Sequence, residues 1–253
     1  MHELSIKIKK DIDLNELFHT FWSVLGAMRQ NGQLNGREMS PFLQNDTMKA
    51  VVSSITEEGL NGNYHNKYVS EGIEVLEKLC GNTLEIKFLG FREGEETAIC
   101  QCAEHAYFVL NYYKDFSPLV CGSCNKAYPV FKLPKLEDFS YWRLLSWMSA
   151  YQGCLLLDLN CGTGEKWAMK QQCDPNSGLS IQGRKVTAKI MEETGVKTYY
   201  YLSNFSKKKK AIDIARPCPS CGGEWHLEEE IHGNIRHKCD KCLLVSTYSS
   251  NHS

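Results

Sequence analysis

The alternation of apolar and polar residues predicts a strand near the amino terminus and a helix directly after it. Residues 4–9 (LSIKIK) alternate with the period of two that a half-buried strand requires. Residues 11–32 space their apolar side chains three and four positions apart, which defines one helical face, and Gly32 is the expected stop. The face consists of Leu14, Leu17, Phe18, Phe21, Leu25 and Met28.

The same two patterns recur further along the chain. Residues 48–56 (MKAVVSSIT) predict a second strand, residues 68–81 a second helix that ends on glycine, and residues 83–91 a third strand. Strands that alternate with helices in this way bury their apolar faces against one another. We therefore expect a small α+β layer over residues 1–95.

The next part of the chain has a different pattern. Residues 97–131 are rich in β-forming residues and interrupted by cysteines, and residues 133–153 predict a loop followed by an aromatic-rich amphipathic helix. Residues 155–165 (LLLDLNCGTGE) predict a strand and a glycine-rich turn. A short helix is expected next, then a longer helix over residues 177–195 and a strand over residues 196–203.

Composition and charge limit the class of protein. The chain has 253 residues, 42% of them hydrophobic, and a formal net charge of −1, so it lacks the general positive field of a phosphate-binding protein. The amino terminus alternates in charge where a signal peptide has an apolar core, and no run approaches the roughly 18 apolar residues of a membrane span. We expect a cytoplasmic protein with no membrane partner, in which twelve cysteines point to metal binding.

The strongest motif is a pair of C-x2-C knuckles near the carboxyl terminus. Cys218 and Cys221 form one knuckle, Cys239 and Cys242 the other, and two short β-like segments joined by a turn lie between them. Four thiolates from two facing knuckles complete a tetrahedral zinc site, which predicts a C-terminal zinc ribbon. The alternative is an exposed redox dithiol, but no βαβ pattern surrounds it. Three histidines, His226, His232 and His237, are expected on the hairpin surface rather than as ligands.

A second cysteine set lies in the middle of the chain. Cys100 and Cys102 form a C-x-C pair, and Cys121 and Cys124 form a C-x2-C knuckle. This spacing predicts a second zinc site, in which His105 could replace one cysteine of the first pair. The alternative is a set of buried free thiols that pack as small hydrophobes. One zinc ion per chain is therefore expected, and two if the middle set also binds metal.

Residues 155–165 also resemble the cofactor turn of S-adenosylmethionine-dependent methyltransferases. That turn requires glycine where this chain has Asn160, and it requires a second strand that ends in an acid about 20 residues later. The sequence after Gly164 is helical in pattern instead. We therefore expect no enzyme, and a methyltransferase is the third choice for function.

Several motifs together resemble a prokaryotic family of Zn-ribbon-containing proteins of unknown function, for which nucleic-acid binding has been inferred from the ribbon. They are CGSC with PVFKLP, SWMSAYQGCLLLDLNCGTGEKWAMKQ, DPNSGLSIQGR, TYYYL, CPSCGGEW and CDKC. The resemblance covers roughly residues 100–245 and implies a zinc ribbon. It also implies that Asn160, Cys161, Gly164 and Glu165 form a family feature, whose purpose it does not supply.

These observations predict an α+β chain with three regions: an N-terminal α/β layer (1–95), a cysteine-clipped mixed middle domain (96–206), and a lysine linker with a C-terminal zinc ribbon (207–253). The favoured function is a non-catalytic protein that engages another protein, for example as an immunity or antitoxin-type inhibitor, because residues 216–247 carry more acids than bases. A small-molecule ligand is not expected. The second hypothesis is nucleic-acid binding. Its candidate residues are Lys207, Lys208, Lys209, Lys210 and Trp225, with Arg184, Lys185, Lys189 and the Tyr199–Tyr201 aromatics in support.

Overall fold

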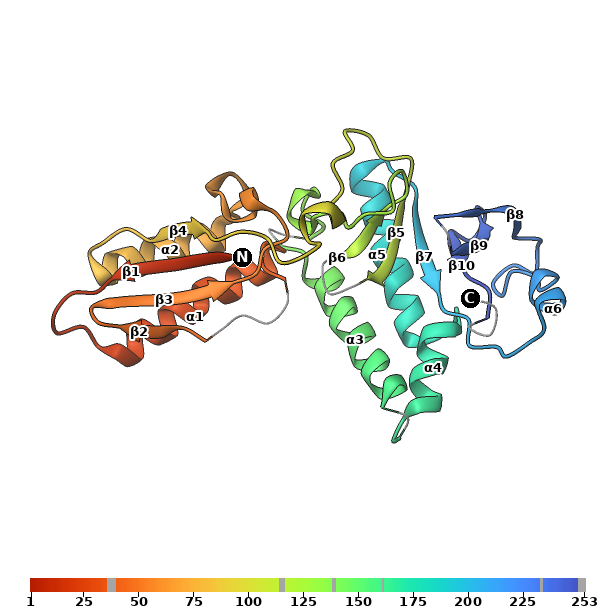
Figure 1. Ribbon diagram of the computed structural model, residues 1–253, viewed down its shortest axis with the longest axis horizontal. Helices are drawn as coiled ribbons and strands as arrows, with labels where there is room; N and C mark the ends of the chain where they lie inside the picture. The colour runs from red at the N-terminus through yellow and green to blue at the C-terminus, as the bar shows by residue number, and fades with distance from the viewer. Residues whose placement is uncertain (36–39, 114–116, 138–139, 161, 233, 250–253) are drawn as a thin grey trace. The chain divides into compact units, whose positions relative to one another are not determined.

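A computed structural model describes residues 1–35, 40–113, 117–137, 140–160, 162–232 and 234–249 (Figure 1). The chain forms two compact units. The N-terminal unit consists mainly of Met1–Ile99 and Ala127–Trp142, and the C-terminal unit of Cys100–Tyr113, Pro118–Lys126 and Arg143–Ser253. The chain is thus a mixed α+β protein, and its predicted division into three domains stays a prediction.

The N-terminal unit contains a four-stranded antiparallel sheet in the order β2-β3-β1-β4. Its strands are β1 (His2–Lys7), β2 (Phe42–Gln44), β3 (Thr47–Val52) and β4 (Glu85–Phe88), and its helices are α1 (Leu14–Gln30) and α2 (Lys67–Cys80). Short 3-10 turns cover Glu57–Leu60, Gly62–Tyr64, Glu96–Ala98 and Val130–Lys132. The strands and helices predicted in this region are confirmed, except that β2 was not foreseen.

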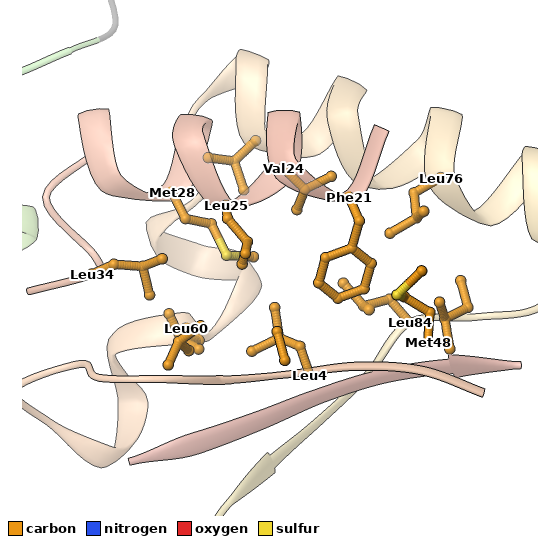
Figure 2. Close-up of a cluster of buried hydrophobic side chains, with 14 of the residues drawn as sticks. Leu4, Phe21, Val24, Leu25, Met28, Leu34, Met48, Leu60, Leu76 and Leu84 are labelled. Atoms are coloured by element: carbon orange, nitrogen blue, oxygen red, sulfur yellow. The ribbon is translucent and has the colours of Figure 1, made fainter. Parts of the chain in front are cut away.

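The two helices pack against one face of this sheet, as Figure 2 shows for the buried side chains between them. Alternate residues of β1 and β3 point into the core, where Leu4 and Met48 meet Phe21 of α1. Capping fixes the helix ends. The carboxylate of Asp13 accepts the backbone N–H of Asn15 at 2.8 Å, which satisfies a free donor at the start of α1.

The C-terminal unit contains a six-stranded sheet in the order β6-β5-β7-β10-β9-β8. The strands are β5 (Phe108–Tyr113), β6 (Ser117–Cys121), β7 (Thr198–Leu202), β8 (His226–Ile231), β9 (Ile235–Cys239) and β10 (Leu244–Ser246). Strand β7 is parallel to both β5 and β10, whereas β8, β9 and β10 are antiparallel neighbours. The cysteine-bearing C-terminal hairpin therefore continues the sheet that the middle of the chain begins.

Four helices belong to this unit: α3 (Trp142–Leu159), α4 (Glu165–Cys173), α5 (Gly178–Thr194) and the short α6 (Lys210–Ile214). Helix α5 packs on β7, and Trp147 of α3 reaches the same strand through an edge-on contact with Tyr200. Ser177 caps the start of α5, and Gly195 ends it with φ +69°, as predicted. None of the described helices is long and apolar enough to cross a membrane.

The predicted strand at residues 155–159 is wrong, because α3 continues through these residues to Leu159. Leu144, Trp147, Tyr151 and Cys154 are buried at the three- and four-residue spacing of a helical face, so the segment from Leu155 onwards extends an established helix. Its leucines are partly or largely exposed, with Leu159 at 67%. A helix thus stands where a methyltransferase cofactor turn follows a strand.

Candidate metal centres

The structure brings the eight predicted cysteine ligands together in two groups of four. The middle cysteine group consists of Cys100, Cys102, Cys121 and Cys124, and the C-terminal cysteine group of Cys218, Cys221, Cys239 and Cys242. Within each group the four sulfur atoms lie within 4.8 Å of one another. Each group could hold a metal ion, and two members of each are buried while two are half-buried.

The middle cysteine group joins two turns of the backbone. Cys121 is the last residue of β6, and the knuckle that follows directs the backbone N–H of Ser123 to the Cys121 sulfur at 3.4 Å. On the other side, the N–H of Cys102 points to the Cys100 sulfur at 3.4 Å. Amide donors of this kind offset the negative charge that several thiolates accumulate in one site.

His105 contacts this group without being one of its four ligands. Its Nδ1 atom lies 3.3 Å from the Cys121 sulfur. Burial acts to raise the pKa of Cys121. The hydrogen bonds from His105 and from the backbone N–H groups of the knuckle outweigh burial and lower this pKa to about 6. Burial raises the pKa of Cys100 well above its usual range. The four cysteine sulfurs gather within 4.8 Å of one another and His105 is not among the grouped residues, so the structure favours the set of four sulfurs over the alternative in which His105 replaces a cysteine.

The C-terminal cysteine group is built from two tight knuckles. In the first, Gly222 donates its N–H to the Cys218 carbonyl at 2.8 Å and adopts φ +71°, a conformation that glycine reaches without strain. In the second, the N–H of Cys242 points to the sulfur of Cys239, the last residue of β9, at 3.4 Å. The sulfurs of Cys221 and Cys239 are 3.7 Å apart, so the two knuckles face each other.

The thiols of the C-terminal cysteine group differ in acidity. The backbone N–H of Gly223 is the main reason that the pKa of Cys221 falls to about 7, whereas burial is the main reason that the pKa of Cys239 rises to about 12. A metal ion binds thiolates, so metal binding here releases the protons that the metal-free group retains.

One of the three hairpin histidines lies elsewhere than predicted. His237 is fully buried, and its Nε2 lies 3.1 Å from the Asp213 carbonyl oxygen, so its assignment to the surface is wrong. His226 is half-buried, with Nε2 2.8 Å from the Tyr248 hydroxyl. His237 alternates with Ile235 and Cys239 on the buried face of β9, and this period of two was the signal in the sequence that could have indicated its burial. Neither His226 nor His237 belongs to a cysteine group.

The third histidine links the two cysteine groups. His232, at the end of β8, places Nε2 2.8 Å from the carbonyl oxygen of Gly122, which lies inside the knuckle of the middle cysteine group. The Tyr107 hydroxyl is 3.3 Å from the same nitrogen. The side-chain amide of Asn125 donates to the His232 carbonyl at 3.5 Å. The hairpin of one group is thus bonded to the knuckle of the other.

The residues proposed for nucleic-acid binding differ in exposure: the lysines are exposed, whereas the tryptophan is buried. The side chains of Lys207 to Lys210 are exposed, and Lys210 begins α6 rather than continuing a linker. Trp225 is only 2% exposed, and its indole N–H donates to the Arg216 carbonyl at 3.1 Å, so its ring presents no open face to a base. The aromatic side chains of β7 are also buried or half-buried in the sheet.

Two residues of the glycine-rich stretch 155–165, Asn160 and Glu165, have local structural roles at helix ends. The side-chain amide of Asn160 donates to the Leu156 carbonyl at 2.7 Å and so closes the last turn of α3. Glu165 is the first residue of α4, where a negative charge favours the helix dipole. Cys161 lies outside the described residues. The other cysteines away from both groups, Cys80, Cys154 and Cys173, are buried or half-buried.

Comparison with known proteins places the chain in a family. A protein of Haemophilus influenzae (strain ATCC 51907 / DSM 11121 / KW20 / Rd), described as uncharacterized, is 30% identical over 241 residues, which cover 90% of each chain. The chain belongs to the family of this protein. A second uncharacterized protein of the same strain is 34% identical over 170 residues, which cover 65% of this chain and 84% of the relative.

Three domain families of unknown function match successive parts of the chain. They are DUF8589 over residues 1–90, DUF2310 over residues 102–203 and DUF8594 over residues 207–252. No solved structure matches the chain. The descriptions of these families name no activity, so membership of a family of unknown function is confirmed and its zinc-ribbon character stays a prediction.

Proposed function

We propose that this protein is non-catalytic, holds a structural zinc ion in each cysteine group, and engages another protein through the edge strand β8. The observation that carries the proposal is the exposed run of three glutamates on β8, the strand that pairs with β9, whose last residue is Cys239 of the C-terminal cysteine group. A surface that must keep its shape while it binds a partner needs rigid support, and a metal-bound hairpin supplies it.

Zinc fits the chemistry of both groups. Four cysteine sulfurs match the tetrahedral, thiolate-rich coordination that zinc adopts in structural sites. Such a set leaves no position for water or substrate, which distinguishes it from a catalytic zinc site with three protein ligands. The amide N–H donors at Cys121 and Cys239 support the same assignment, since a zinc-bound thiolate is stabilised by them.

The partner surface is suggested by charge. Strand β8 is the outer strand of the six-stranded sheet, and Glu228, Glu229 and Glu230 are all exposed on it. Arg236 forms an ion pair with Glu230, which leaves the charges of Glu228 and Glu229 uncompensated by any described ion pair. Acidic side chains oppose the binding of phosphates and favour a basic surface. An immunity-type role fits this charge, because enzymes that act on nucleic acids carry basic surfaces of this kind.

Charge reversal tests the proposal. A photoreactive amino acid at position 229 of the zinc-loaded protein identifies what lies against β8 in cells that produce it. The candidate is then purified, and its affinity is measured by calorimetry. We expect Glu228→Lys with Glu229→Lys to weaken binding at least ten-fold, whereas Glu71→Lys with Glu74→Lys, an equal charge change on exposed residues of α2, leaves it unchanged. Equal affinities for the two double variants would refute the role of β8.

Nucleic-acid binding is the second candidate, and the exposure of Lys207 to Lys210 favours it. Four adjacent lysines can contact successive phosphates, and such contacts weaken steeply as salt rises. Mixed-sequence single- and double-stranded probes at low salt decide the question. Micromolar binding that falls with added salt, and that is lost when the four lysines are changed to glutamine, would support this candidate against the first.

A further inference from the structure

The C-terminal unit contains a pocket of about 460 Å³ between α4 and the segment that follows β7. Its walls include Met169 and Cys173 of α4, Leu202 of β7 and Phe205, and both Lys166 and Lys170 line it. The volume lies within the range of pockets that bind small molecules. Pro219, which lies between Cys218 and Cys221 in the first knuckle of the C-terminal cysteine group, also lines the pocket, so the pocket borders that group. A small-molecule ligand is not expected from the sequence.

The charges around the pocket are of one sign. Lys166, Lys170 and Arg216 line it, and none of the described residues that line it is acidic. The guanidinium of Arg216 is already engaged, because its Nε lies 2.9 Å from a carboxylate oxygen of the fully buried Asp213. In contrast, neither lysine of α4 forms an ion pair with another described residue, and both are exposed. Two ammonium groups, one helical turn apart, are therefore available to an anion at the pocket mouth.

The rest of the pocket is suited to an apolar or aromatic body. Met169, Leu202 and the half-buried Phe205 line that part of the pocket, and the hydroxyl of Ser203, another lining residue, lies 3.1 Å from the Tyr151 hydroxyl. A ligand that uses both parts has an anionic group joined to an apolar body. Burial of the apolar body in the pocket adds affinity, because ion pairs with two exposed lysines alone contribute little.

We infer that this pocket binds a phosphate monoester on an aromatic or apolar body, of about the size of a mononucleotide. A phosphate monoester carries about −1.5 to −2 charges near pH 7, which matches the two unpartnered ammonium groups. Lysine is a common phosphate ligand and acts as a point charge. A free mononucleotide and the 5′-phosphorylated end of a nucleic-acid strand both carry this chemistry.

Calorimetry on the full-length, zinc-loaded protein tests the inference with AMP, adenosine and inorganic pyrophosphate as probes. We expect AMP to bind with a dissociation constant below about 1 mM and adenosine at least ten-fold more weakly, a difference of about 1.4 kcal/mol. Lys166→Gln with Lys170→Gln should weaken AMP binding at least ten-fold. The control, Lys78→Gln with Lys185→Gln, removes two exposed lysines outside the pocket and should leave it unchanged.

Cys173 gives a second readout that does not depend on heat. Its half-buried thiol lines the pocket, so a bound ligand should slow its modification by N-ethylmaleimide, which peptide mass spectrometry follows at this residue alone. We expect at least three-fold protection by saturating AMP in the wild type and none in the double lysine variant. Protection that is equal in both proteins would overturn the assignment of the lysines.

Short oligonucleotides distinguish the two sources of the phosphate. If a 5′-phosphorylated dinucleotide binds as AMP does and its unphosphorylated form does not, the pocket also accepts a strand end. If AMP binds and the phosphorylated dinucleotide does not, the ligand is a free mononucleotide. No heat with AMP or pyrophosphate at millimolar concentration, or binding only by long strands regardless of the 5′ phosphate, would overturn the inference. None of these outcomes depends on β8 or its partner.

Discussion

The imidazole Nε2 of His232 lies 2.8 Å from the carbonyl oxygen of Gly122, and this contact connects two cysteine groups that are far apart in the sequence. Gly122 belongs to the knuckle of the middle group, and His232 to the hairpin whose second strand ends at Cys239 of the other. A Cβ atom on Gly122 would stand 2.3 Å from the ring of Tyr107, whose hydroxyl lies 3.3 Å from the same nitrogen of His232, so Tyr107 packs against both the knuckle and this histidine. Loss of order in one metal site should therefore reach the other.

Replacement of His232 by alanine should loosen both sites together. The variant loses one hydrogen bond of about 1 kcal/mol and leaves the Gly122 carbonyl without its partner. We expect a chelator to remove both zinc ions faster, as a colorimetric zinc indicator records. The control is His19→Ala, which removes an exposed histidine from α1. Faster release from the C-terminal cysteine group alone would show that the contact does not couple the two groups.

Replacement of Cys239 by serine should remove one zinc ion from the protein. Metal analysis of the wild type is expected to give about two zinc ions per chain, and analysis of the variant about one, because a serine hydroxyl does not replace a thiolate ligand. The hairpin should then become sensitive to protease, since a site of this size supplies much of its own folding energy. Cys173→Ser changes a cysteine outside both groups and should keep two zinc ions. An unchanged zinc content in Cys239→Ser would contradict the assignment.

Replacement of His105 by alanine should move zinc loading of the middle group to higher pH. The hydrogen bond from His105 lowers the pKa of the Cys121 thiol, so its removal raises that pKa, and more protons must leave when zinc binds. At pH 6.5 we expect the affinity to fall about 10-fold or more, as for other residues that support metal ligands. Competition with a chelator of known affinity measures it. The C-terminal cysteine group is the internal control and should be unaffected.

Local patterns in the sequence predicted most of the elements and both cysteine groups. The alternation in β1 and the face of α1 depend on neighbours in the chain, so they could be identified without the fold. The C-x2-C knuckles are local in the same sense. Each knuckle supplies two cysteines and a structural zinc ion takes four ligands, so the second pair of each group could be inferred from the sequence.

Features that depend on distant parts of the chain could not be predicted. The parallel pairing of β10 with β7 places Leu244 beside Tyr200, and nothing in either strand specifies the other. The partner of the buried His237, the Asp213 carbonyl, also lies outside the hairpin. At residues 155–159 the leucine-rich composition favoured a strand, but the helical face established by Trp147 and Tyr151 extends α3 instead.

Lys135 should make the N-terminal unit more stable as pH rises above 8. Burial lowers the pKa of its ammonium group to about 8, while the unfolded chain has the ordinary value of about 10.4. Between these two pKa values the unfolded state binds more protons than the folded state, so the free energy of unfolding rises with pH. Below pH 8 the ammonium group is charged in both states, and the full cost of burying that charge destabilises the folded state. Urea unfolding of the wild type and Lys135→Gln, compared at each pH, isolates this contribution. A difference that stays constant from pH 8 to 10.4 would contradict it.

Gly183 of α5 should tolerate no side chain, because the helix lies directly on β7. A Cβ atom at this position would stand 2.2 Å from the Tyr200 ring and 2.6 Å from Nε1 of Trp147, and both side chains are buried. Gly183→Ala must therefore displace α5, at a cost of about 1–3 kcal/mol. Gly153→Ala is the matched control, since that glycine lies within α3 and, apart from its chain neighbours and the backbone of its own helix, no atom lies within 4 Å of the added Cβ. There the change should stabilise the helix by up to about 1 kcal/mol. Thermal unfolding of the two zinc-loaded variants should thus shift in opposite directions, and equal shifts would show that α5 does not pack this closely.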